Sequence, residues 1–280
     1  MTTRQAVHES RVRGERGEFH LRVWPTEGAP VAVVLLLHGL GEHAGLHAPL
    51  AERLNADGIE VWAPDHIGHG LSDGTRVLVE SLDALTDDAE LVLDLIAAGR
   101  PDVPLVLAGH SLGAAITLLL AGTRPAAAHA RALVLAGASV GLSPGESGLR
   151  KLLEEHGIDP MSLRKDPAEL CGNAEYAEQL RNDPLVWSGG LRPETLDALE
   201  AGGRRIAELV TGGTLTRPVL FVHGEADDLA PASAVLAAAE ILPNARARIF
   251  PGDLHNVLAE NDREQVHAEI VEFVLAHAND

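Results

Sequence analysis

The stretch that decides the fold is Val103-Pro104-Leu105-Val106-Leu107-Ala108-Gly109-His110-Ser111-Leu112-Gly113-Ala114-Ala115. An apolar run ends at Gly109, a serine follows two residues later, and an apolar helical pattern begins at Gly113. This Gly-x-Ser-x-Gly spacing is typical of a nucleophile elbow, in which a buried strand turns sharply into a helix. The two glycines leave room where the strand and helix approach each other. We therefore predict that Ser111 stands at a helix N-terminus, where unpaired N–H groups favour negative charge.

Composition limits the kinds of protein that this chain can be. Its 280 residues are 46% hydrophobic, enough for one large α/β domain or a core with an insertion. The 41 acidic residues outnumber the 22 basic residues, and the formal net charge is −19. This charge repels nucleic acid and disfavours anionic membrane surfaces. Cys171 is the single cysteine, so no intrachain disulfide is possible, and we expect it to act as a small apolar filler.

The sequence also lacks the signals of export or membrane insertion. Residues 1–30 are polar and charged, without the apolar core of a signal peptide. No apolar segment reaches the length of a membrane span. We therefore expect a cytoplasmic protein without a transmembrane segment.

Strand and helix patterns alternate along most of the chain, which indicates a mostly parallel central sheet with helices on both faces. The strands are expected at residues 11–16 and 18–23 (an antiparallel edge hairpin around Gly17), 31–37, 60–65, the run ending at Gly109, 132–136, 218–224 and 245–250. The helices are expected at residues 50–57, 81–98, the run following Ser111, 232–241 and 262–277.

The alternation stops between residues 140 and 216, where no strand pattern is found. Instead there are helical patterns at residues 148–156, 167–180 and 193–210. A stretch this long between strands is rarely a bare loop. We therefore predict a helical cap, or lid, at 140–216, inserted into a core formed by 1–139 and 217–280. Most of its apolar side chains should pack internally, and a minority should line a pocket above Ser111.

Polar side chains follow the ends of four predicted strands: His38 to His43, Ser111, Gly224 to Asp228, and Gly252 to His255. In parallel sheets, function gathers at these carboxyl ends. Ser111, Asp227 and His255 follow one another in the order typical of the α/β-hydrolase fold. In such a triad the imidazole takes the serine proton, and the carboxylate orients the imidazole and stabilises its charged form.

The same pattern predicts an oxyanion hole. Its donors would be the backbone N–H groups of Leu112, just after the serine, and of Leu40, just after His38-Gly39. Two choices remain open in this region. Asp228 rivals Asp227, although the Gly-x-x-Asp spacing favours Asp227.

The second open choice concerns the clustered histidines. Four of them, His38, His43, His66 and His69, lie on two loops and could suggest a metal cluster. They lack a nearby thiolate and a helical His-Glu-x-x-His pattern, so we predict no metal site. The alternative is that His66 and His69 hydrogen-bond to the loop that supports Leu40. His267 is expected on the final helix, at the surface or in packing.

Several motifs together resemble the monoacylglycerol lipase and lysophospholipase branch of the serine hydrolases. The motifs are His38-Gly39-Leu40-Gly41-Glu42-His43, Asp65-His66-Ile67-Gly68-His69-Gly70-Leu71-Ser72, Gly109-His110-Ser111-Leu112-Gly113, Asn182-Asp183-Pro184-Leu185, Gly224 to Asp227, and His255. The resemblance extends from about residue 10 to the C-terminus and implies an α/β-hydrolase fold with a mobile cap and no cofactor. It also implies that Glu42 corresponds to an acidic residue near the glycerol hydroxyls. One departure is Leu46-His47, which stands where the mammalian lipases have an Arg-Tyr pair.

The resulting functional prediction is a serine hydrolase that cleaves carboxylic esters of lipid-like substrates through an acyl-enzyme. Its partner would be a small lipid ester, and the cap would make at most transient contact with a lipid surface. Three alternatives stay open. They are a small-ester esterase or lactonase, a related peptidase, and a ligand receptor that retains the hydrolase fold.

Overall fold

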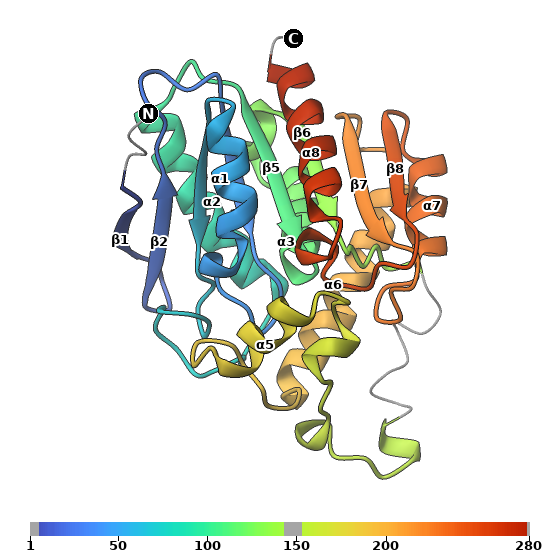
Figure 1. The fold of residues 1–280 in the computed structure, drawn as a ribbon. Helices are drawn as coiled ribbons and strands as arrows, with labels where there is room; N and C mark the ends of the chain where they lie inside the picture. Colours follow the sequence, from blue (N-terminus) through green and yellow to red (C-terminus); the bar gives the residue numbers. More distant parts are fainter. Residues whose placement is uncertain (1–5, 143–152, 279–280) are drawn as a thin grey trace.

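The computed structural model describes residues 6–142 and 153–278, and an eight-stranded sheet forms its centre (Figure 1). The strand order is β1-β2-β4-β3-β5-β6-β7-β8. The pairs β1–β2 and β2–β4 are antiparallel, and all other neighbouring strands are parallel. The strands are β1 (His8–Arg13), β2 (Glu18–Trp24), β3 (Ala32–Leu37), β4 (Ile59–Pro64), β5 (Leu105–His110), β6 (Ala130–Ala136), β7 (Val219–Gly224) and β8 (Ala245–Phe250).

Helices connect the strands and cover the sheet. The α-helices are α1 (Ala48–Ala56), α2 (Leu82–Gly99), α3 (Leu112–Thr123), α5 (Ala174–Asn182), α6 (Pro193–Thr211), α7 (Ala232–Ile241) and α8 (Arg263–Ala278). Short 3-10 helices lie at η1 (Ala44–His47), η2 (Pro125–His129), η3 (Pro160–Ser162), η4 (Pro167–Glu169) and η5 (Val257–Ala259). No helix in these described parts of the chain is long and apolar enough to cross a membrane.

The alternation of side chains along β3 shows how the sheet separates two hydrophobic cores. Val33, Leu35 and Leu37 face one core, which also contains apolar side chains of α2, α3 and α7. Val34 and Leu36 face the other core, under α1 and α8. Because both faces of the strand are buried, every position is apolar, as expected for a central parallel strand.

The segment between β6 and β7 extends beyond the carboxyl ends of the parallel strands, at the bottom of Figure 1. Its described part contains η3, η4, α5 and α6 and no strand. The predicted helix at 193–210 corresponds to α6. The predicted helix at 148–156 falls partly outside the described residues, and residues 153–155 are helical.

Two sequence-based boundaries were wrong. The first strand ends at Arg13 rather than Arg16, because Gly14 N donates to Gly17 O and closes a turn there. The predicted helix at 167–180 is divided into η4 and α5. The break lies at Asn173, whose side chain accepts hydrogen bonds from Glu175 N and Tyr176 N and so caps α5.

Candidate active site

Ser111 occupies a strained turn between β5 and α3. Its φ is 51° and its ψ is −116°, in the left-handed half of the backbone map that L residues rarely adopt. The turn is held because Ser111 N donates to Ala136 O at 2.9 Å, which ties the apex to β6. Such strain is commonly retained at functional sites. The structure therefore places Ser111 at the turn where the sequence predicts a nucleophile.

The glycines on either side explain the Gly-x-Ser-x-Gly spacing. A Cβ atom on Gly109 would collide with the backbone carbonyl of Gly113, and one on Gly113 would collide with the carbonyl of Leu37. Strand, turn and helix are thus packed too closely for any side chain at these two positions. The serine is brought directly over the carboxyl end of the sheet.

Three predicted residues meet at this apex. Ser111 Oγ lies 2.9 Å from His255 Nε2, and His255 Nδ1 lies 2.8 Å from Asp227 Oδ2. With the proton on Nδ1, His255 donates to the carboxylate, and its Nε2 accepts the serine hydroxyl proton. Asp227 Oδ1 accepts from the backbone N–H groups of Leu229 and Ala230, at 2.9 and 3.0 Å. The carboxylate is therefore fixed by its own loop.

Asp228, the rival of Asp227, lies elsewhere. Its carboxylate is exposed and paired with Lys165 Nζ, at 2.6 and 2.7 Å. Sequence reasoning missed a different neighbour of Asp227, namely His223 at the end of β7. His223 Nε2 lies 2.6 Å from Ala230 O and 3.2 Å from Asp227 Oδ2. Its position at the end of a predicted strand was the sequence feature that could have identified it as a site residue.

The surroundings of the three side chains suit general-base chemistry. Burial lowers the pKa of His255, and the charge of His110 adds to this effect, while Asp227 opposes it. Burial by itself raises the pKa of Asp227, but hydrogen bonds from His223 and His255 outweigh it and hold that pKa well below its ordinary value. At neutral pH, Asp227 is therefore ionised and His255 is a neutral base.

The two predicted oxyanion donors follow β3 and β5, which are neighbouring parallel strands. Leu112 is the first residue of α3, where N–H groups have no partner within the helix. Leu40 lies in the turn after β3, in which Glu42 N donates to Gly39 O and Gly39 N donates to Glu42 Oε2 at 2.7 Å. His66 Nε2 also lies 3.1 Å from His38 O, and this contact braces the same loop.

Of the two histidines predicted to hydrogen-bond to the loop that supports Leu40, only one does so in the structure. His66 contacts the loop that supports Leu40, as predicted, but His69 Nδ1 bonds instead to Ile67 O in its own loop. His43 is separate from these rings and pairs with Asp183 at 2.9 Å. His267 is buried and donates to Leu258 O, so it serves packing.

Cys171 has the environment expected of an apolar filler. It is buried among Leu46, Tyr176 and Leu180 in a small cluster under the helical segment. Burial raises the pKa of its thiol to about 12. The thiol therefore stays protonated and unreactive at neutral pH.

Glu42 is engaged inside the protein. Besides Gly39 N, its Oε2 contacts His110 Nδ1 at 3.1 Å and His47 Nε2 at 3.2 Å. Burial by itself raises the pKa of Glu42, but His110 and His47 outweigh it and hold that pKa well below its ordinary value. Burial likewise lowers the pKa of His110, yet Glu42 outweighs it and the net shift is upward. Glu42 and His110 therefore each stabilise the charged form of the other inside the protein.

A cavity of about 350 Å³ adjoins Glu42 and His110. Its wall includes Glu42, His47 and His110, together with Asn256, the residue after His255. Polar side chains of α5 and the start of α8 also line it, namely Glu175, Gln179 and Arg263, beside apolar residues such as Leu46, Leu50 and Leu258. The cavity thus offers hydrogen-bonding groups next to the candidate triad.

Comparison with known proteins agrees with this geometry. The family model described as "Serine aminopeptidase, S33" matches residues 28–262. The chain belongs to this family. It is a carboxylic ester hydrolase with the α/β-hydrolase fold, and the sequence-based expectations of fold and family are confirmed.

One relative and two solved structures are similar to the chain over nearly their whole length. A monoacylglycerol lipase of Mycolicibacterium smegmatis is 30% identical, over 91% of this chain and 92% of its own. The crystal structure of a Paleococcus ferrophilus monoacylglycerol lipase has a TM-score of 0.77 at 26% identity, covering 92% of this chain and 99% of that chain. The crystal structure of a soluble variant of the Saccharomyces cerevisiae monoglyceride lipase, in complex with a substrate analogue, has a TM-score of 0.83 at 19% identity. It covers 99% of this chain and 98% of that chain.

Proposed function

We propose that this hydrolase cleaves lipid-like carboxylic esters, with monoacylglycerols as its substrate class. The observation that carries the chemistry is the run of hydrogen bonds from Ser111 through His255 to Asp227. The substrate class is supported by the likeness to the lipase of Mycolicibacterium smegmatis over most of both chains. In this proposal, residues 140–216 act as a cap on a core formed by 1–139 and 217–280.

The proposed reaction proceeds in two halves. His255 Nε2 takes the proton of Ser111 Oγ, which attacks the ester carbonyl carbon. The oxyanion is stabilised by the N–H groups of Leu40 and Leu112, and Asp227 stabilises the imidazolium. His255 then protonates the departing alcohol, and an acyl-enzyme remains. Water, activated by the same imidazole, releases the fatty acid and restores the serine.

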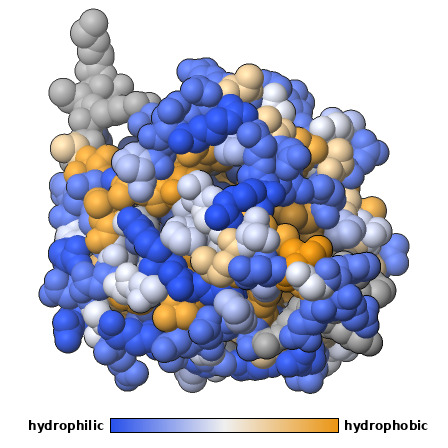
Figure 2. Space-filling view, turned by 90° about the horizontal axis from the view of Figure 1, so that it is seen from below, coloured by the Kyte–Doolittle hydropathy of each residue, from blue (hydrophilic) through white to orange (hydrophobic). Residues whose placement is uncertain are grey.

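The two parts of the substrate require different surroundings. The cavity beside Glu42 supports a polar alcohol such as glycerol, because carboxylate, imidazole and amide groups line it. The acyl chain requires apolar surface. Viewed from below the fold of Figure 1, orange apolar surface interrupts an otherwise largely hydrophilic face (Figure 2). Ile158 in the helical segment and Leu229 after Asp227 are among the exposed large hydrophobic residues.

Peptide hydrolysis is a second candidate, because the matching family model is described as a serine aminopeptidase. The same Ser–His–Asp chemistry cleaves esters and amides, so the triad does not separate them. A substrate panel does. It should contain monoacylglycerols and p-nitrophenyl esters of graded chain length, with aminoacyl p-nitroanilides beside them.

We expect the highest kcat/KM for the longer acyl esters and for monoacylglycerols, and labelling of Ser111 by a fluorophosphonate probe. The Ser111→Ala variant is the control for both measurements. Preference for acetate or butyrate esters would indicate a small-ester esterase, and preference for the anilides a peptidase. A folded chain that the probe does not label would indicate a receptor instead.

A further inference from the structure

Three buried side chains with metal-binding atoms converge behind the triad. They are Glu42, His47 and His110, which come from the loop after β3, from η1 and from the end of β5. One ligand atom of each lies within 4.8 Å of the other two. Glu42 Oε2 is 3.2 Å from His47 Nε2 and 3.1 Å from His110 Nδ1. Sequence reasoning missed this group, because its members do not form a metal-binding motif along the chain.

These separations fit tetrahedral zinc. With zinc–nitrogen and zinc–oxygen bonds of about 2.0–2.1 Å, neighbouring ligands of a tetrahedral site lie roughly 3.3 Å apart. Both separations from Glu42 are already close to that value. The two imidazole nitrogens lie within 4.8 Å of each other. Two imidazoles and one carboxylate are also a donor set that zinc takes when a fourth position is left open.

Neighbouring groups orient the three ligands, and a cavity gives a metal ion access to them. His110 Nε2 lies 3.2 Å from His255 O, so this nitrogen carries its proton and donates, and Nδ1 is directed at the site. Ligand histidines in metalloproteins are usually oriented by such a bond from the other ring nitrogen. Gly39 N, at 2.7 Å from Glu42 Oε2, holds the carboxylate. All three side chains line the cavity of about 350 Å³, which supplies an entry path and room for a water ligand.

We propose that Glu42, His47 and His110 bind a zinc ion, and that this ion inhibits ester hydrolysis. Zinc would replace the hydrogen atoms on His47 Nε2 and His110 Nδ1. The His110 proton leaves to solvent, because Nε2 of that ring already carries a hydrogen, and the His47 proton leaves or moves to Nδ1. The His110 and His255 rings lie 5.2 Å apart, so the ion would oppose the positive charge that His255 gains during catalysis. The binding part does not depend on the proposed function; the inhibitory part does.

Metal binding is tested first, with Co²⁺ as a spectroscopic substitute for Zn²⁺ on the full chain without a histidine tag. We expect one equivalent with the intense visible bands of tetrahedral Co²⁺, displaced by one equivalent of Zn²⁺. The His47→Gln variant should bind at least about 100-fold more weakly, because losses of outer-shell partners alone reach that range. The His129→Gln variant, changed at an exposed histidine in η2, is the matched control and should bind like the parent chain.

A second variant separates ligation from a structural role. His47→Cys removes the imidazole but supplies another zinc ligand, so it should retain the tetrahedral spectrum and add a thiolate-to-cobalt charge-transfer band. If His47 only serves as a hydrogen-bond donor to Glu42, the His47→Gln and His47→Cys variants behave alike and neither gains this band. Weak octahedral bands in the parent chain, or equal binding by the His47→Gln and His129→Gln variants, would overturn the site.

Inhibition is measured next as the ratio of kcat/KM with and without saturating Zn²⁺ in each protein. We expect a loss of at least about tenfold in the parent chain, reversed by EDTA, and a ratio near one for His47→Gln. Stoichiometric binding without loss of hydrolysis would overturn the inhibitory part alone. Failure of the proposed function is distinct from both outcomes, since a chain without esterase activity would still give the cobalt spectrum.

Discussion

The loops that carry the candidate triad meet the helical segment between β6 and β7 beyond the carboxyl ends of the parallel strands. Different kinds of contact hold the two regions in place. The loops are fixed by backbone. Ser111 is strained, Gly109 and Gly113 exclude side chains, and Asp227 is held by N–H groups of its own loop. The helical segment is attached to the core by side chains and by several backbone groups, and two of these attachments contact different parts of the core.

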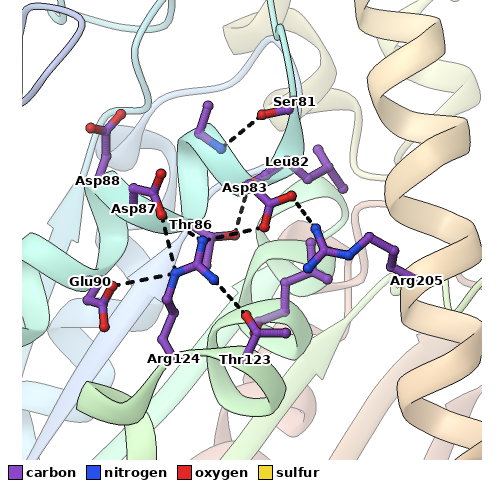
Figure 3. A network of polar contacts seen from close by, with 12 residues as sticks. Ser81, Leu82, Asp83, Thr86, Asp87, Asp88, Glu90, Thr123, Arg124 and Arg205 are labelled. Atoms are coloured by element: carbon purple, nitrogen blue, oxygen red, sulfur yellow. Dashed lines mark hydrogen bonds and ion pairs between the residues drawn. The ribbon is translucent and has the colours of Figure 1, made fainter.

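At the first place, α6 is attached to α2 and to the chain leading into it. Arg205 on α6 pairs with Asp83 on α2, and Asp83 also pairs with Arg124 in the network of Figure 3. Thr195 Oγ1 donates to Val77 O at 2.7 Å and accepts from Val79 N at 3.0 Å. None of these residues belongs to the candidate site.

At the second place, the part of the segment around α5 is attached to the catalytic loops. Asn173 Nδ2 donates to Ala259 O, and Gly172 N donates to Glu260, which also accepts from Leu254 N, just before His255. Trp187 N donates to Gly41 O beside the predicted oxyanion donor Leu40. We infer that changes near α6 affect stability, that changes in the loops affect chemistry, and that changes near α5 affect both.

The largest effect is expected in the loops, from Ser111→Ala. This substitution removes the nucleophile and leaves its surroundings in place, so kcat should fall by about 10⁶-fold while the chain stays folded. Ester turnover and thermal unfolding are measured on the same sample. Near-normal turnover in the variant would rule out Ser111 as the nucleophile.

Asp227→Asn is expected to have the next largest effect. The amide leaves His255 without its carboxylate and favours the wrong imidazole tautomer, so kcat should fall by about 10⁴-fold. Asp228→Asn is the matched control. It loses only an exposed pair with Lys165, which contributes at most about 1 kcal/mol, so its activity should stay within about twofold of the parent. The reverse order of effects would make Asp228 the carboxylate of the triad.

The pH dependence of kcat/KM tests His255 as the base. Only the neutral imidazole accepts the serine proton, and burial lowers the pKa of His255 below its ordinary value. Activity should therefore be constant above about pH 6.5 and fall about tenfold per pH unit below the lowered pKa. Circular dichroism at each pH confirms that the chain is folded. A profile that stays flat down to about pH 4 contradicts this role.

Near α5, Asp183→Asn should reduce both activity and stability to a small extent. Asp183 Oδ2 accepts from His43 Nε2 at 2.9 Å, and this bond joins the segment to the loop carrying Leu40. A hydrogen bond to a charged group contributes about 1.5–3 kcal/mol, of which the neutral amide keeps part. We expect kcat/KM to fall about fivefold.

The matched control for Asp183 is Asp166→Asn, in the same segment. Asp166 also accepts a side-chain hydrogen bond, from Arg181, and a backbone N–H two residues ahead, but within the described part of the chain its side-chain partners lie outside the catalytic loops. The two variants should unfold at similar temperatures, and only Asp183→Asn should have a lower kcat/KM. Equal kinetic effects would show that α5 is not coupled to the site through His43.

The same contrast explains what the sequence predicted and what it did not. The elbow, β3 and β7 were predictable because one local pattern of apolar residues and glycines determines each of them. The break at Asn173 was missed: Asn is a preferred N-cap residue, but the sequence does not show that Asn173 and Gly172 also contact Ala259 and Glu260 far along the chain. The grouping of Glu42, His47 and His110 needs three segments at once, so no single motif contains it.

The smallest kinetic effect is expected at α6, from Thr195→Val. The substitution keeps the shape of a fully buried side chain but leaves Val77 O and Val79 N without their partner. Val77 has a φ of 53°, unfavourable for a β-branched residue, so this contact also holds a strained backbone.

We therefore expect the free energy of unfolding to fall by about 2 kcal/mol, with kcat/KM unchanged at 25 °C. Thr211→Val, at an exposed position at the end of the same helix, should change stability by less than about 0.5 kcal/mol. Denaturant unfolding and ester kinetics distinguish the two variants. A fall in kcat/KM for Thr195→Val, measured well below its unfolding temperature, would mean that α6 also positions the catalytic loops. The helical segment would then no longer have one attachment, at α6, that affects stability alone.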